Sequence, residues 1–189
     1  MIPRKFFLPF ALLLTQLVGC SITISDDRPR VSFALAADAA PPGLMDKVRQ
    51  EAFDTDWVGD TNRMAVASIS VPDGRTLYLV DPSVVPPKGT IARDPYLSPL
   101  CGKRGCRYLG LIEYEGAYKT VLDIYAQSLL PPGEELFQVE PRDRGLPCLV
   151  VTEYPNAGLD DAPLLRTRYC FDGQRYRSEG TTRHLIKES

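Results

Sequence analysis

Four cysteines in the second half of the chain carry the clearest chemistry: Cys101, Cys106, Cys148 and Cys170. Their spacings do not fit the close cysteine pairs of a zinc site, and none forms the Cys-x-x-Cys motif of a redox-active pair. Disulfide bonds are therefore expected, and four cysteines allow three pairings. Two glycines inside the 101–106 segment favour Cys101–Cys106. Cys148 begins one expected strand and Cys170 ends another, which favours Cys148–Cys170.

Residues suited to catalysis are sparse. The single histidine, His184, lies near the C-terminus, and no Gly-x-Ser-x-Gly elbow is present. The adjacent acids Glu134-Glu135 and Asp160-Asp161 stand beside turn residues, which is more typical of exposed loops than of the paired carboxylates of a glycosidase. We expect no catalytic residue and no cofactor. An envelope hydrolase that uses carboxylates remains the alternative.

An acidic segment, Asp54 to Asp60, resembles the start of a calcium-binding loop. In the EF-hand pattern, Val58 would occupy the fifth position and Ala65 the twelfth, where a bidentate glutamate is required. The pattern fails at both positions. We expect a solvated turn there and no metal site.

Tyrosine and arginine recur side by side on expected strands. Such side chains can hold sugars or peptides when they share one sheet face, although tyrosine is also an ordinary strand residue. The expected binding face consists of Arg107, Tyr108, Arg168, Tyr169, Arg175 and Tyr176.

The N-terminus has the plan of an export signal. Arg4 and Lys5 precede an apolar stretch that ends in Leu17-Val18-Gly19-Cys20. This run resembles the lipobox of bacterial lipoprotein precursors. The resemblance covers residues 1–20 and implies a signal peptide at 1–19, lipidation of Cys20 and a membrane anchor. Because Ser21 stands where an aspartate would retain the protein at the inner membrane, the resemblance favours the outer membrane.

Two other readings of this region stay open. The uncharged residues 6–25 are long enough to span a bilayer without cleavage, although their polar residues and Pro9 make a poor span. Cleavage could also follow Ala36, but four charged residues separate that site from the apolar stretch.

Charge excludes one class of partner. The chain has a formal net charge of −2, and loss of residues 1–19, with two basic residues and no acidic one, leaves −4. This is not the composition of a nucleic-acid-binding protein. We expect the partner to be the membrane, through the anchor, together with an envelope protein or a cell-wall polymer.

Residues 20–43 mix small and charged residues and are expected to be a flexible tether before a single domain at 44–189. Apolar residues four apart predict a helix at 44–53. Alternation and turn signals then predict eight strands: 64–71, 76–80, 107–114, 117–125, 135–140, 148–154, 165–171 and 175–179.

The expected fold is α+β and mostly β, with one N-terminal helix followed by an antiparallel sheet of about eight short strands that could close as a barrel. The segments 101–106, 130–133 and 170–173 resemble those of uncharacterised exported proteins of cyanobacterial type, and this resemblance implies no known activity. We expect a non-catalytic, lipid-anchored envelope protein that works by binding. An inhibitor of a secreted enzyme is a second alternative.

Overall fold

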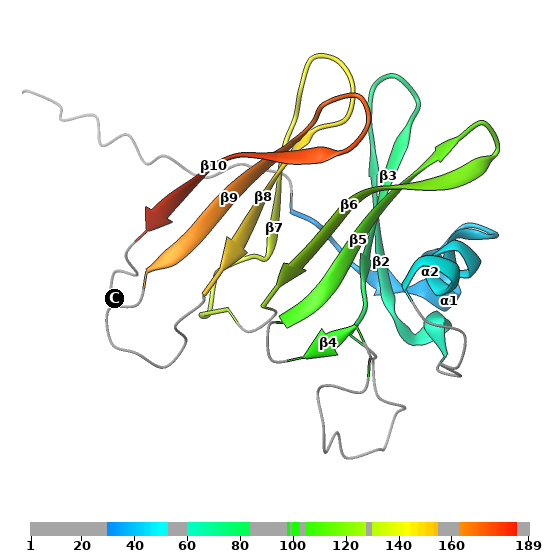
Figure 1. Ribbon diagram of the computed structural model, residues 1–189, viewed down its shortest axis with the longest axis horizontal. Helices are drawn as coiled ribbons and strands as arrows, with labels where there is room; N and C mark the ends of the chain where they lie inside the picture. Colours follow the sequence, from blue (N-terminus) through cyan, green and yellow to red (C-terminus); the bar gives the residue numbers. More distant parts are fainter. Residues whose placement is uncertain are drawn as a thin grey trace, which may run out of the picture.

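The computed structural model describes residues 30–52, 60–83, 98, 100–102, 105–127, 130–154 and 163–184. These residues form two antiparallel sheets and a few short helices (Figure 1). Among them, no helix has both the length and the apolar character needed to cross a membrane.

The first sheet has the strand order β1-β2-β3-β5, with β6 on the other side of β5 and the short β4 paired to the beginning of β5. Its strands are β1 (Ala34–Leu35), β2 (Ala65–Ser70), β3 (Thr76–Asp81), β4 (Cys101–Gly102), β5 (Gly105–Tyr114) and β6 (Ala117–Ala126). The second sheet has the order β10-β9-β8-β7. Its strands are β7 (Phe137–Glu140), β8 (Cys148–Glu153), β9 (Leu164–Phe171) and β10 (Tyr176–His184).

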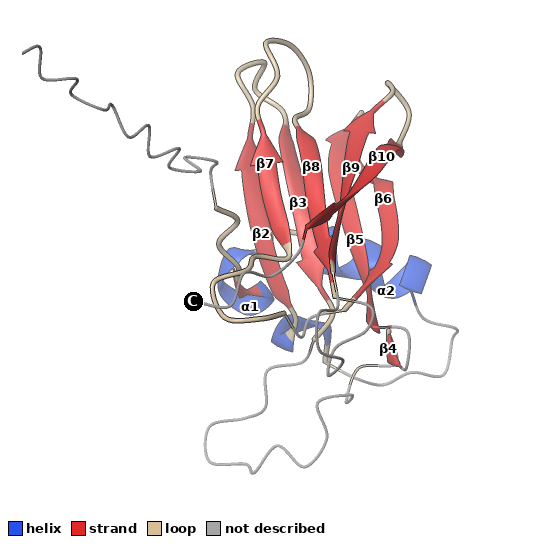
Figure 2. Ribbon diagram, turned by 90° about the vertical axis from the view of Figure 1, so that its left-hand side faces the viewer, coloured by secondary structure: helices blue, strands red, loops and turns tan. Residues whose placement is uncertain are grey.

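The two sheets share one core, and the helices form a third layer (Figure 2). Strand β5 shows how this arises, because successive side chains of a strand point to opposite faces. Tyr108 and Ile112 pack between the sheets, whereas Leu109 and Leu111 pack on the opposite face. That face is covered by α1 (Ala36–Ala39) and α2 (Leu44–Ala52), and a short 3₁₀ helix at Thr61–Arg63 follows.

The predicted elements are confirmed in kind. The helix expected at 44–53 is α2, and each of the eight expected strands has a counterpart among the longer strands. The expectation of one sheet is wrong in detail, because the described strands divide into two open sheets and do not close into a barrel. The elements not predicted are α1, the 3₁₀ helix and the two-residue strands β1 and β4.

The expected tether is too long at its C-terminal end. Val31 and Phe33 pack against the core between the sheets, and Ala36 is buried under the helical layer. The reason is visible in the sequence, since Val31, Phe33 and Leu35 alternate with smaller or polar residues as a strand would. The folded domain therefore already includes residue 30, which bridges to Gln138.

Both expected disulfides are present. Cys101–Cys106 joins β4 to β5, and Cys148–Cys170 joins β8 to β9. Each links residues on adjacent antiparallel strands, where facing side chains come close enough to be bridged.

Candidate functional site

The expected tyrosine–arginine face does not form. Tyr108 and Tyr176 are buried in the core between the sheets, with exposed fractions of 1% and 7%. Tyr176 donates a hydrogen bond to the carbonyl oxygen of Pro147 at 2.8 Å. Burial raises the pKa of both tyrosines. Tyr169 is partly buried against the same core, so the three tyrosines point inward.

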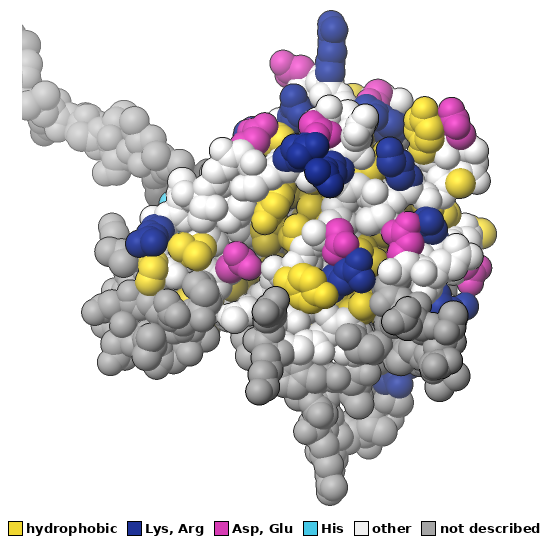
Figure 3. Space-filling view, in the orientation of Figure 1, with side chains coloured by type: hydrophobic (Ala, Val, Ile, Leu, Met, Phe, Trp, Pro, Cys, Tyr) yellow, Lys and Arg dark blue, Asp and Glu magenta, His cyan; other side chains and the backbone are white. Residues whose placement is uncertain are grey.

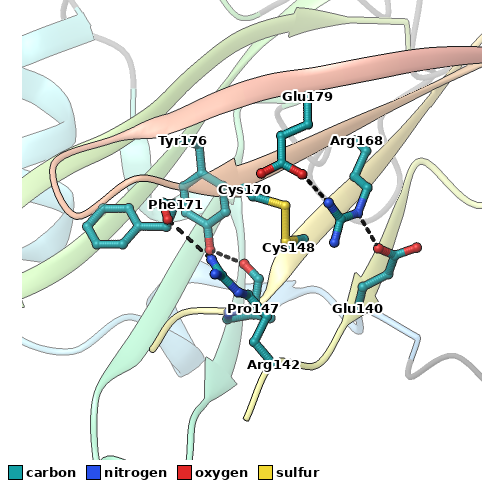
Figure 4. The surroundings of a disulfide bond; sticks show 9 residues. All are labelled: Glu140, Arg142, Pro147, Cys148, Arg168, Cys170, Phe171, Tyr176 and Glu179. Carbon is teal, nitrogen blue, oxygen red and sulfur yellow. Dashed lines mark hydrogen bonds and ion pairs between the residues drawn. A yellow bond between two sulfur atoms is a disulfide. The ribbon is translucent and has the colours of Figure 1, made fainter. Parts of the chain in front are cut away.

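The neighbouring arginines lie elsewhere and differ in their partners. Arg107 forms an ion pair with Asp123 at 2.7 Å. Arg168 lies on the outer face of the second sheet between the carboxylates of Glu140 and Glu179 (Figure 4). Arg175, in the turn before β10, has no ion-pair partner among the described residues.

The carboxylates and the histidine singled out in the sequence have structural partners. Glu134 pairs with Arg166, and Glu135 pairs with Arg30, both at 2.9 Å. His184 is exposed and lies 3.1 Å from the hydroxyl of Thr182. Asp160-Asp161 and most of the acidic segment after α2 lie outside the described residues.

Asp60, the described end of that acidic segment, accepts a hydrogen bond from the Asn62 amide and caps the 3₁₀ helix. Within the described ranges, no group of histidine, cysteine, aspartate or glutamate side chains could hold a metal ion.

The β5–β6 hairpin and three other hairpin loops lie at one end of the two sheets (Figures 1 and 2), and those three contact one another. They connect β2 to β3, β7 to β8 and β9 to β10. Arg142 of the second loop donates to the carbonyl oxygen of Phe171 at 3.3 Å, beside the third. A Cβ placed on Gly145 would lie 3.6 Å from the guanidinium of Arg75 in the first loop. The Tyr176–Pro147 hydrogen bond ties the second loop to the third.

The β5–β6 hairpin carries Glu113 and Glu115, whereas the three contacting loops are rich in arginine, and we call these three loops the basic end. Its arginines are Arg75, Arg142, Arg144, Arg175 and Arg177. Three aspartates accompany them: Asp73, Asp143 and Asp172. Asp73 pairs with Arg75, and Asp172 pairs with Arg177. Arg142, Arg144 and Arg175 form no ion pair within the described residues. A local excess of positive charge thus sits on a chain whose net charge is −2.

The aspartate of the β9–β10 turn organises this cluster. Asp172 accepts hydrogen bonds from the amides of Gln174 and Arg175, at 2.8 and 2.9 Å, and from the Arg177 guanidinium. These donors, the Arg175 amide first, lower its pKa. This carboxylate therefore holds the turn together, and no described carboxylate pairs with the Arg175 side chain.

An open groove of about 610 Å³ runs from the basic end between the two sheets. One wall is Thr120–Asp123 of β6, and the other is Arg175–Ser178 of the β10 side. Figure 3 shows hydrophobic surface in this hollow, with basic side chains gathered above it. Within the described part of the chain, β6 pairs with β5 alone and β10 pairs with β9 alone, so both walls are free sheet edges there.

The opposite side of the molecule is filled by its own chain. Arg30 bridges to Gln138 of β7, and β1 pairs with β2, so residues 30–35 cross from one sheet edge to the other. Phe33 lies beside Phe137, with ring centroids 6.2 Å apart. We call residues 30–35 the strap. The two sheets are therefore joined along one side and open along the other.

Of the residues expected to bind, only Arg175 belongs to both the basic end and the open groove. The loop arginines Arg75, Arg142 and Arg144 were missed, because turn arginines carry no periodic signal and only the fold brings their loops together. No known protein family, no curated protein and no solved structure matches the chain.

Proposed function

We propose that this chain is an exported, lipid-anchored protein that works by binding an anionic partner through its basic end. The observation that carries the proposal is the convergence of three hairpin loops with arginines that lack carboxylate partners within the described residues. Loops held by a rigid sheet scaffold are a frequent location of binding sites. Arginine suits anionic groups because its planar guanidinium donates in pairs to carboxylates and phosphates.

Two disulfides support the exported part of the proposal, since such bonds persist in oxidising compartments. The anchor itself rests on the resemblance of Leu17-Val18-Gly19-Cys20 to a lipobox. Metabolic labelling with an alkyne-tagged fatty acid tests it. Label on the wild-type chain but not on Cys20→Ala supports the anchor. A mature N-terminus at Ala37 without lipid contradicts it.

Photo-crosslinking in the producing cell tests the binding site. A photo-reactive amino acid replaces Gln174 in one strain and Leu35 in another. Gln174 is exposed in the β9–β10 turn beside Arg175, so the arginines of the basic end stay in place. Leu35 is the matched position, because it is 40% exposed and pairs with Ala65, at the far end of β2 from the basic end. Adducts from position 174 that are absent from position 35 support the proposal.

Charge reversal completes this test. Arg142→Glu is introduced in the strain that carries the crosslinker at position 174 and should remove the adducts. Arg183→Glu makes the same change on β10 at the end away from the turn, and it should preserve them. No adduct at position 174, in cells where acylation of Cys20 is confirmed, contradicts the proposal.

A further inference from the structure

The open groove offers a place for a strand that none of the described residues supplies. Its walls are the edges of β6 and β10, and its floor includes the buried side chains of Leu122 and Tyr176. Each wall contributes four consecutive residues. At about 3.3 Å per residue, a segment of roughly four extended residues fits along it.

The strap shows which kind of occupant such a groove accepts. On the opposite side of the same two sheets, residues 30–35 lie extended across the edges of β7 and β2. Their inward side chains, Val31 and Phe33, pack against the shared core. An extended segment with alternate apolar side chains therefore satisfies both the sheet edges and the core on that side, and the open side presents the same two kinds of surface.

The charged residues along the groove indicate which charge its occupant should carry. Arg175 and Arg177 line the groove beside β10. Arg177 is paired with Asp172, whereas Arg175 has no ion-pair partner within the described chain. On the other wall Asp123 is neutralised by Arg107. Among the described residues that line the groove, Arg175 is the cation without an ion-pair partner, which favours an acidic residue in the occupant.

One of the two edges is better suited to pair. Strand β6 has a bulge between its pairs with Gly110 and Leu111, inside the stretch that lines the groove. Strand β10 keeps a regular register from Tyr176 to Ser178, and its bulge follows at Glu179. A bulge interrupts the ladder and turns an edge away from a new partner. The regular edge at 176–178 is therefore the pairing site.

We propose that the open groove binds an extended peptide segment of a partner protein, which adds as a short strand to the edge of β10 and places an acidic side chain against Arg175. Addition of a strand to a free sheet edge is a common mode of peptide recognition, in which main-chain hydrogen bonds supply affinity and side-chain pockets supply specificity. This inference rests on the proposed binding function and names the class of partner.

Selection from a random-peptide display library tests it, with the full-length chain purified in detergent as the target. The blocking variant is Ser178→Trp. Ser178 is exposed, lies two residues beyond Tyr176 on the same face of β10 and lines the groove, so a large side chain there fills the groove without displacing the core. The matched control is Ser70→Trp, the same change at an exposed position of β2.

We expect enriched peptides that share an acidic residue next to alternating apolar ones, bind wild type and Ser70→Trp alike, and are lost with Ser178→Trp. N-methylation of alternate amides in a selected peptide should weaken binding about tenfold or more, because the methyl group removes a main-chain donor. Any of three results overturns the inference. The selected peptides could bind Ser178→Trp as well as wild type, they could share no acidic residue, or no peptide could be enriched on wild type relative to Ser178→Trp.

The two proposals fail separately. Adducts from position 174 that persist in Ser178→Trp cells would keep the basic end as a binding site and remove the added strand. Those adducts would then come from a polymer, or from a protein bound at the loops alone. A dimer that dissociates with Ser178→Trp would instead identify a second copy of this chain as the occupant, and would overturn the choice of partner.

Discussion

At the scale of residues, strand alternation decides what the tyrosines and arginines can do. Arg107 and Tyr108 are neighbours on one strand, as are Arg168 and Tyr169, so the members of each pair point to opposite faces. One face of each strand faces the core, and the tyrosines lie there. Adjacent Arg-Tyr pairs therefore predict amphipathic strands and cannot by themselves build a shared binding face.

Asp81, at the end of β3, makes the protein's stability depend on pH. Burial raises its pKa, although the amide and hydroxyl of Ser83 donate to it at 2.9 and 2.6 Å. The folded state thus holds a proton more tightly than the unfolded state, and stability falls as pH rises through the raised pKa.

Asp81→Asn removes that titration and keeps an oxygen for Ser83. The buried hydroxyl of Tyr108 lies beside the Asp81 carboxylate and also acts to lower its pKa, and the new amide can donate to that hydroxyl. We expect the free energy of unfolding of the variant to be higher at neutral pH. The gain should be about 1.4 kcal/mol for each unit by which burial raises the pKa of Asp81. Urea unfolding of both proteins between pH 4 and pH 8 measures the difference, which should shrink toward the acidic end.

Asp73→Asn is the control, and its effect on stability at neutral pH should have the opposite sign to that of Asp81→Asn. Hydrogen bonds from Arg75 lower the pKa of Asp73, so its carboxylate stabilises the fold above its unfolded pKa and loses that effect as pH falls. The stability lost in Asp73→Asn should therefore stay nearly constant between pH 4 and pH 8 and shrink only below about pH 4, whereas the stability gained in Asp81→Asn should change above that pH. If the stability difference from wild type changed with pH in the same way for both variants, the pH dependence would arise elsewhere in the chain.

At the scale of elements, the strands could be predicted because their signals are local. The Pro72-Asp73-Gly74 turn, the tight Glu115-Gly116 turn and the Asp172-Gly173 turn fix three hairpins, and the strands on either side alternate. The pairing of Cys148 with Cys170 followed from the same reasoning, since strands joined in register bring their ends together.

The division into two sheets could not be read in this way. The break at Pro131-Pro132-Gly133 marks the end of β6 without saying whether the chain returns to the same sheet. Strand β5 carries the better signal, because most of its residues are buried on both faces and so require a layer on each side. The groove and the basic end depend on how the two sheets stack, and no local pattern encodes that.

The two disulfides should differ in what they contribute. Loop closure predicts about 3 kcal/mol for Cys148–Cys170, with a sequence separation of 22, and about 2 kcal/mol for Cys101–Cys106, with a separation of 5. Each pair replaced by alanine and unfolded in urea gives the two losses. Equal losses, or a larger loss for the short loop, would show that native packing around the bridges outweighs chain entropy.

At the scale of the whole molecule, the strap joins the two sheets, and under the proposed anchor it also limits how far the domain can lie from the membrane. Because the domain begins by residue 30, a lipid on Cys20 would leave residues 20–29 as the spacer. Ten residues reach at most about 35 Å, at roughly 3.5 Å per residue. The proposed partner must then present its acidic segment close to the same membrane.

Phe33→Ala tests whether residues 30–35 belong to the fold. Phe33 is partly buried and contacts Phe137, so its truncation should lower the free energy of unfolding by roughly 2 kcal/mol, less than the 3–5 typical of a fully buried phenylalanine. Ser32→Ala, at the exposed neighbouring position, should change stability little. Urea unfolding gives both values, and hydrogen exchange should show faster exchange across residues 30–35 and along β2 in Phe33→Ala alone.

A slack tether at these residues would give two variants that unfold and exchange like the wild type. In that case both sides of the paired sheets would be open, and the strap would no longer support an extended peptide as the occupant of the groove beside β10.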